Sequence, residues 1–126
     1  HIGDGAVIEN SMIYNGCDIK GEVKNSIIFP GVSVEEGASV QDSVIFFNNR
    51  IGKGCEIRKT ISDVNCTYNE RVKVGLKLND GPKKIAVIGW NNNVPSSTEL
   101  GAGITVSPRL PKDRWPSFAE PGEVIR

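Results

Sequence analysis

Three cysteines and one histidine are the residues of this chain best suited to chemistry on their own: Cys17, Cys55, Cys66 and His1. Thiolates and imidazoles bind zinc when they come in closely spaced pairs, and no such pair occurs here. An odd number of cysteines also argues against a disulfide framework. We therefore expect the three cysteines to pack as small buried side chains, with no catalytic residue and no metal ligand among them.

Glycine pairs of the form Gly-x-Gly could in principle hold a phosphate. They occur at residues 3–5 and 52–54, but a phosphate-binding loop needs a helix directly after it, and no helical pattern follows either pair. The same glycines fit tight corners, where residues with a Cβ atom are strained. No nucleotide or other cofactor site is predicted from them.

Charge and composition exclude several classes of partner. Among the 126 residues, fifteen basic and fifteen acidic side chains cancel, so no net field attracts nucleic acid or anionic lipid. The longest apolar run, 44–47, is far shorter than the roughly 20 residues that span a bilayer, and no signal peptide pattern is present. A cytoplasmic protein is the default expectation. Because the sequence opens on histidine and directly on a repeat, we interpret it as a fragment of a longer protein.

A repeat organises most of the chain. The block that starts at Ile2 aligns with the block that starts at Val34, with the aliphatic positions in register. The motif Asn/Asp-Ser-aliphatic-Ile recurs at 10–13, 25–28 and 42–45, with an echo at 59–62. Aliphatic residues follow one another at steps of six, sometimes five or four, which no helix produces. The guide positions are Ile2, Ile8, Ile13, Ile19, Val23, Ile28, Val34, Val40, Ile45, Ile51 and Ile57.

Steps of six predict short strands joined by turns, and three steps, as from Ile2 to Ile19 or from Val34 to Ile51, make one triangular coil. Small residues four positions after many guides, including the cysteines and Ile61, are expected to point inward as well. We expect coils over 1–75, a loop at 76–84, a final coil over 85–108 and an irregular, proline-rich cap at 109–126. About five coils would form an all-β prism roughly 24 Å long.

The order of segments resembles the C-terminal domain of bacterial glucose-1-phosphate adenylyltransferase, within the sugar nucleotidyltransferase family. The resemblance covers NSIIFPGVSVEEGASVQDSVIF, IGKGCEIRKTISDVN and IAVIGWNNNVPSSTELGAGITVSP, and extends up to Pro108. It implies a left-handed hexapeptide β-helix. It also implies a glycine-rich nucleotide loop and Mg²⁺-binding aspartates in a catalytic domain outside this sequence. This domain would then support tetramer assembly and effector control, and would be inactive alone.

Two positions depart from the pattern of that family. Relatives place a basic residue after the Asp of an Ile-Asp-basic-Asn pattern and another in the last coil, whereas this chain has Val64 and Trp90 there. An apolar side chain cannot replace a charge-assisted contact to phosphate, so we expect weak binding of phosphorylated effectors. The cations that could have taken over the role are Arg50, Lys53, Arg58, Lys59, Arg71, Lys73, Arg109, Lys112 and Arg114.

Other members of the hexapeptide group remain alternatives. Acyltransferases with this prism use a catalytic histidine, for which this chain offers only His1, and a zinc prism needs three histidines. The C-terminal domain of another sugar-1-phosphate nucleotidyltransferase, such as mannose-1-phosphate guanylyltransferase, stays open, as does a purely structural module.

One side of the expected prism is apolar at three consecutive residues in each of three coils. Because neighbouring strand residues face opposite ways, an apolar column must lie outside in either phase. In one phase the outer residues are Tyr14, Phe29, Phe46, Met12, Ile27 and Val44, and in the other they are Ile13, Ile28 and Ile45. We expect this side to be an interface with the parent's catalytic domain or a neighbouring subunit, or with a second copy when the fragment is alone.

Overall fold

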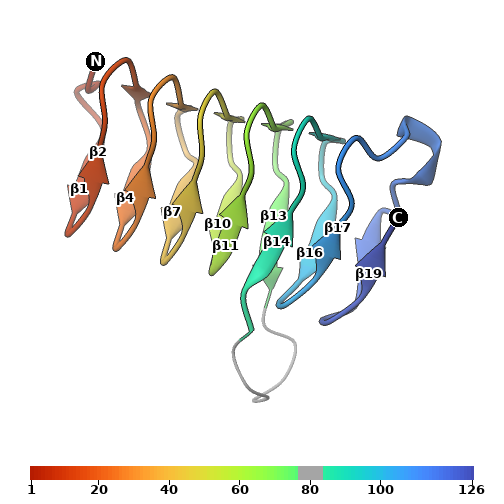
Figure 1. The fold of residues 1–126 in the computed structure, drawn as a ribbon. Helices are drawn as coiled ribbons and strands as arrows, with labels where there is room; N and C mark the ends of the chain where they lie inside the picture. The colour runs from red at the N-terminus through yellow and green to blue at the C-terminus, as the bar shows by residue number, and fades with distance from the viewer. Residues whose placement is uncertain (77–83) are drawn as a thin grey trace.

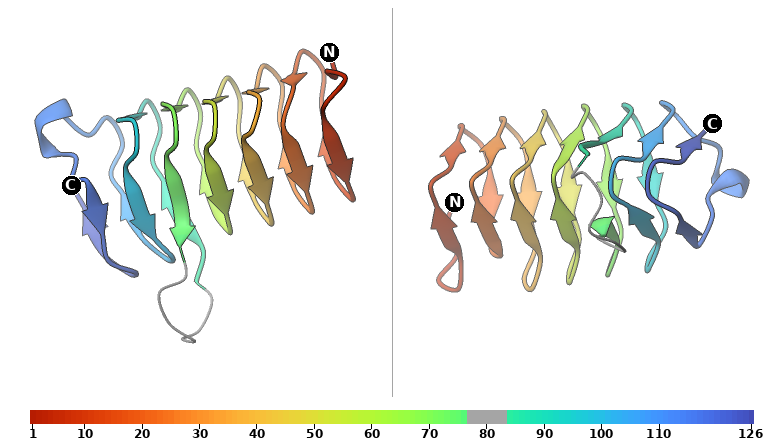
Figure 2. Two further views of the ribbon diagram at one scale, coloured as in Figure 1. Left: turned by 180° about the vertical axis from the view of Figure 1, so that it is seen from behind. Right: turned by 90° about the horizontal axis from the view of Figure 1, so that it is seen from below.

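The chain folds into a parallel β-helix of seven stacked coils, with its two ends at opposite ends of the stack (Figure 1). The computed structural model describes residues 1–76 and 84–126. Three sheets run along the stack, and Figure 2 shows the coils from behind and from below. No helix of the described residues is long and apolar enough to cross a bilayer.

Every ladder pairs parallel strands from successive coils. The first sheet contains β1 (Val7–Glu9), β4 (Glu22–Lys24), β7 (Ser39–Gln41), β10 (Glu56–Arg58), β13 (Lys73–Leu76), β16 (Glu99–Gly101) and β18 (Phe118–Ala119). The second contains β2 (Met12–Ile13), β5 (Ile27–Ile28), β8 (Val44–Ile45), β11 (Thr60–Ser62), β14 (Ala86–Ile88), β17 (Thr105–Val106) and β19 (Val124–Ile125). The third contains β3 (Asp18–Ile19), β6 (Ser33–Val34), β9 (Arg50–Ile51), β12 (Thr67–Tyr68) and β15 (Asn93–Val94).

Strands this short form because each contributes one apolar residue to the interior and turns immediately afterwards. The inner column of the second sheet, for example, stacks Ile28 on Ile45, both fully buried, through the β5–β8 ladder. Along a strand, alternate residues face opposite sides, so the neighbours of each inner residue point to solvent. All the guide aliphatics from Ile19 to Ile57 are buried, which confirms the interior predicted from the steps of six.

The corner between the second and third sheets needs a left-handed residue in each of the first five coils. Gly16 and Gly31 fill this place in the first two coils, with φ of 74° and 78°. Asparagine takes over at Asn48, Asn65 and Asn91, because it tolerates this conformation better than other residues with a Cβ atom. The corner repeats at the same place in the stack, so side chains next to it form columns.

A ladder of hydroxyl groups runs along the corner between the first and second sheets, and it explains the recurring serine motif. The hydroxyl of Ser26 accepts the N–H of Ser43 at 3.1 Å, and the hydroxyl of Ser43 accepts the N–H of Thr60 at 3.2 Å. Each hydroxyl also donates to the carbonyl two residues before it, at 2.7–2.8 Å. The ladder thus satisfies buried backbone donors at a point where no strand pairing does so.

Two expectations about extent need correction. The number of coils is seven rather than five, because residues 73–106 form two coils, the fifth and the sixth, and residues 109–126 are not an irregular cap throughout. After a short 3₁₀ helix, η1 (Lys112–Arg114), strands β18 and β19 join the first and second sheets. Prolines of this stretch lie outside the strands, where a missing N–H costs no ladder hydrogen bond. The expected loop at 76–84 falls mostly outside the described residues; Leu76 ends β13, and β14 begins two residues after Lys84.

Candidate interaction surface

The three cysteines are free and buried, as the sequence predicts. Each lies just after a corner, and its thiol contacts a carbonyl of the next coil: Cys17 Sγ is 3.2 Å from the Phe29 oxygen, and Cys66 Sγ is 3.1 Å from the Gly89 oxygen. Burial raises the pKa of both Cys55 and Cys66 above that of an ordinary thiol. Their thiols are therefore protonated at neutral pH and poor nucleophiles.

A polar cluster lies inside the fourth coil, where Ser62 replaces an aliphatic residue of the inner column. Its hydroxyl bonds the Oδ1 atom of Asn49 and lies 2.6 Å from the hydroxyl of Tyr68, which is fully buried. The Nδ2 atom of Asn49 donates to the carbonyls of Phe46 and Asp63 at 3.0 and 2.8 Å. Every member of the cluster has a partner, so it stabilises one register rather than marking a reaction site.

Sequence reasoning missed this cluster because it assigned Ile61 to the interior. Ile61 pairs with Val44 on the outer side of β11 and is half-buried, while Ser62 pairs with Ile45 on the inner side. The echo of the motif at 42–45 in residues 59–62 was the signal for this register. The serine can face the interior because its hydroxyl meets two partners, Asn49 and Tyr68, which come from other parts of the coil.

The second sheet presents its apolar side residues to solvent, in the phase that places the aromatic residues outside. Met12 and Tyr14 are exposed, and Ile27, Val44, Phe29 and Phe46 are half-buried. Their inner neighbours Ile28 and Ile45 are fully buried. The structure thus decides between the two phases that the sequence left open.

The aromatic rings stack along the coils. The ring centroids of Tyr14 and Phe29 are 5.2 Å apart, and those of Phe29 and Phe47 are 5.5 Å apart. The rings of Phe29 and Phe46 are nearly parallel, with their centroids 5.0 Å apart. Such stacking follows from the strand spacing of about 4.8 Å between coils, which suits ring-to-ring contact. The rings form a continuous ridge along the first three coils.

Two outer columns run along the second sheet, one beginning at Met12 and one at Tyr14. Val64 and Trp90 belong to a third outer column, at the corner beside this sheet. The carbonyls of Pro30, Phe47, Val64 and Trp90 accept from the residues at the left-handed position one coil later, so these residues occupy equivalent places in successive coils. Trp90 is 46% exposed and Phe47 is 44% exposed. The two positions that resemblance associates with effectors therefore lie in a continuous apolar column.

We use the name apolar surface for these three outer columns of the first five coils. Sequence reasoning identified six of its members. It missed others such as Ile61 and Val87, which strand pairing places in the same outer column as Val44. Its apolar residues are Met12, Tyr14, Ile27, Phe29, Pro30, Val44, Phe46, Phe47, Ile61, Val64, Val87 and Trp90.

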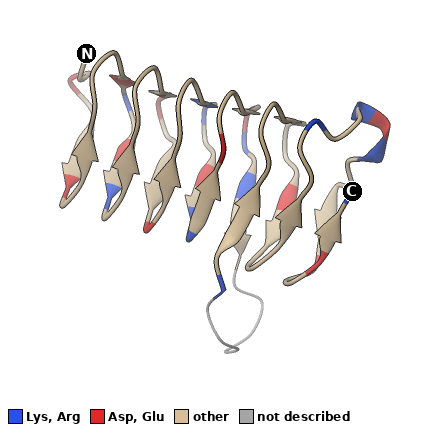
Figure 3. Cartoon of the chain, viewed as in Figure 1, with Lys and Arg blue, Asp and Glu red and all other residues tan. Residues whose placement is uncertain are grey.

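The basic residues do not converge on a single site. Arg50 lies 3.7 Å from Glu35, and Arg71 lies 3.2 Å from Glu70. Arg58 and Lys73 both contact Glu56, at 3.9 and 3.7 Å. Figure 3 shows acidic and basic residues distributed along the whole solenoid. Among the described residues no group of three or more His, Cys, Asp or Glu side chains could hold a metal ion.

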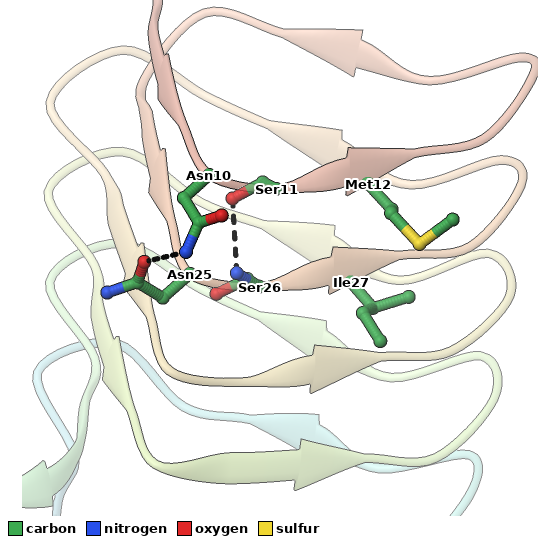
Figure 4. Close-up of a pocket in the computed structure, with 6 residues that line it drawn as sticks. All are labelled: Asn10, Ser11, Met12, Asn25, Ser26 and Ile27. Atoms are coloured by element: carbon green, nitrogen blue, oxygen red, sulfur yellow. Dashed lines mark hydrogen bonds between the residues drawn. The ribbon is translucent and has the colours of Figure 1, made fainter.

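A shallow hollow of about 290 Å³ lies at the polar edge of the apolar surface (Figure 4). Asn10 donates through Nδ2 to the Oδ1 atom of Asn25 at 2.7 Å, and Met12 lies above Ile27 beside them. The amides are bonded to one another, and the hollow is open and small. It forms a polar rim for the surface rather than a site enclosing a ligand.

Comparison with known proteins places this architecture in a family. The family model described as "GlmU-like, C-terminal hexapeptide" matches residues 2–89. A glucose-1-phosphate adenylyltransferase of Acetivibrio thermocellus is 31% identical over 94% of this chain and 30% of its own length. One from Desulfitobacterium hafniense is 36% identical over 84% of this chain and 27% of its own length. One from Bacillus thuringiensis is 46% identical over 48% of this chain.

The chain spans less than a third of the length of the first two relatives. The family match covers four of the coils and reaches the fifth, as far as the corner that carries Trp90. The repeat, the parallel coils and these matches agree. The chain belongs to the GlmU-like C-terminal hexapeptide family.

Proposed function

We propose that this chain is the non-catalytic oligomerisation and regulatory domain of a glucose-1-phosphate adenylyltransferase, which joins ATP and glucose 1-phosphate to give ADP-glucose and pyrophosphate for glycogen synthesis in the cytoplasm. The relatives carry that enzyme name, and this chain corresponds to less than a third of their length. Mg²⁺ would be held in the catalytic portion, since the described residues offer no fitting donor set.

The observation that carries the proposal is the apolar surface, which is suited to contact with the catalytic portion of the same or a neighbouring subunit. Three outer columns about 15 Å wide, over coils about 4.8 Å apart, cover roughly 400 Å². The largest apolar patch on a typical monomer covers roughly 300–600 Å², and a patch of this size is often functional. The polar rim, with Asn10 and Asn25 on one side and Asn48, Asn65 and Asn91 on the other, resembles the border of an interface.

The decisive experiment introduces two carboxylates on this surface of the full-length parent protein. With Phe29→Asp and Phe46→Asp, we expect sedimentation to show loss of assembly or of compactness, with reduced nucleotidyl transfer. Covering each ring contributes on the order of 2 kcal/mol by area, and a buried carboxylate opposes it. A control with Ser39→Asp and Gln41→Asp adds the same charge to the first sheet. Unchanged sedimentation and activity of the Phe variant would refute the proposal.

Two properties of the 126-residue chain follow from the proposal. It releases no pyrophosphate by itself, since the nucleotide loop and metal carboxylates are assigned to the catalytic portion; release above a heat-killed control would contradict this. Val64 and Trp90 predict weak binding of sugar bisphosphate or phosphoglycerate. Micromolar binding by calorimetry would contradict that expectation.

A further inference from the structure

A single carboxylate lies in the interior of the apolar surface. Asp63 follows β11 in the fourth coil, at the place that Phe46 occupies one coil earlier: the Phe46 N–H donates to Ser62, and the Asp63 N–H donates to Ile88. Asp63 therefore lies in the middle one of the three columns, between Phe46 and Gly89, with Ile61 and Val64 beside it.

The side chain of Asp63 is half-buried and held in place. Its Oδ1 atom accepts the N–H of Val64 at 2.7 Å. None of the ion pairs formed by residues 1–76 and 84–126 involves it. One neutral hydrogen bond does not compensate a carboxylate that a partner covers, because desolvation of an unpaired charge costs several kcal/mol.

A second copy of the chain cannot supply the missing charge. The apolar surface contains no lysine or arginine, so a second such surface offers Asp63 no cation. A two-fold axis across the third coil, which is the centre of the first five, would seat each Asp63 against the apolar second coil of the other copy. The area covered in such a pair, roughly 800 Å² in total, is also below that of a typical stable dimer.

We propose that Asp63 selects what covers the apolar surface: it pairs with a guanidinium or ammonium group on the catalytic portion of the parent enzyme, and it prevents a second copy from binding there. This inference rests on the proposed function and deepens it. Phe29, Phe46 and Trp90 supply the apolar contact around the ion pair, and Val64 and Trp90 act as contact residues instead of effector ligands. Such a charge contributes chiefly to specificity.

The first experiment follows side-chain exposure by hydroxyl-radical footprinting in the full-length protein and in the 126-residue chain. Phe29, Phe46 and Trp90 are expected to react several-fold more slowly in the full-length protein. Asp63→Arg removes this protection and Asp63→Asn reduces it, whereas Asp113→Asn, a charge change on the exposed η1 helix, leaves it intact. Absence of protection in the wild type refutes the proposed covering itself. Protection that survives Asp63→Arg refutes only the role of Asp63.

The second experiment measures self-association of the 126-residue chain by sedimentation equilibrium. The Asp63→Asn variant retains a side-chain oxygen that can accept the Val64 N–H, so the substitution changes charge with little effect on the fold. We expect it to tighten self-association by at least about tenfold, with Asp113→Asn unchanged. Adding Phe29→Asp and Phe46→Asp abolishes the gain. Equal self-association of the wild type and Asp63→Asn would refute the proposal that Asp63 prevents a second copy from binding.

Discussion

The first and second sheets have the same seven-strand topology and equally buried inner columns, yet their outer columns differ. Outside the first sheet, Glu22, Lys24, Glu56 and Arg58 face solvent. The second sheet presents aliphatic and aromatic residues instead. The inner columns specify the β-helix. We therefore expect the outer columns, which the fold itself does not need, to determine what each face contacts.

The largest effect expected from this division comes from adjacent residues of β5. Ile28 is fully buried in the inner column, whereas Ile27 is half-buried on the apolar surface. We expect Ile28→Ala to lower the free energy of unfolding of this chain by about 2–5 kcal/mol. Ile27→Ala is expected to cost about 1 kcal/mol or less. Urea denaturation followed by circular dichroism measures both, and equal losses would end the distinction between inner and outer columns.

We expect the free energy of unfolding to decrease at high pH, because titratable groups of the interior then lose protons on unfolding. Burial raises the pKa of Tyr68 well above its ordinary value, and raises those of Cys55 and Cys66. The folded state then binds protons that the unfolded state has lost. Stability is complete below about pH 9 and falls as pH rises above the unfolded thiol and phenol values of about 9 and 10.

Tyr68→Phe is expected to reduce the steepness of this loss between pH 9 and about 11, because it removes one of the titrating groups. At pH 8 the variant loses about 1 kcal/mol, from the hydrogen bond to Ser62. Urea midpoints across this pH range make the comparison, and parallel curves for wild type and Tyr68→Phe would contradict it.

A substitution of Ser43 tests how much the hydroxyl ladder, at the corner between the first and second sheets, contributes to stability. Ser43→Ala leaves the buried N–H of Thr60 without its acceptor, and we expect a loss of about 1–2 kcal/mol in unfolding free energy. Ser33→Ala removes a hydroxyl from the outside of the third sheet and is expected to change stability by less than about 0.5 kcal/mol. If Ser43→Ala lost no more stability than Ser33→Ala, water would have replaced the Ser43 hydroxyl as the acceptor for the Thr60 N–H.

The smallest effect is expected on the charged face. Glu56 lies 3.9 Å from Arg58 and 3.7 Å from Lys73, and all three side chains are 40–50% exposed. Glu56→Gln is expected to change the unfolding free energy by no more than about 0.5 kcal/mol, with little further change in salt. A larger loss would mean that the first sheet also depends on its outer column.

The sequence alone predicted the parallel coils, the buried cysteines and six residues of the apolar surface, because periodic burial is a one-dimensional pattern. It did not predict the seventh coil, since the four prolines from Pro108 to Pro121 suggested irregular structure although they lie outside the strands. Ser62 and Tyr68 were missed for a different reason. Whether an inward hydroxyl is tolerated depends on partners from neighbouring coils, which only the three-dimensional register brings together.

The coil length itself varies without disturbing the stack. The spacing from Ser11 to Ser26 in the hydroxyl ladder is shorter than the spacing from Ser26 to Ser43, and β11 pairs with β14 across a much longer interval. The pairing of β10 with β13 and of β11 with β14 continues on either side of that interval. Parallel pairing between successive coils therefore depends on the register of the strands and not on a fixed number of residues per coil, so coils of unequal length can share one continuous interior.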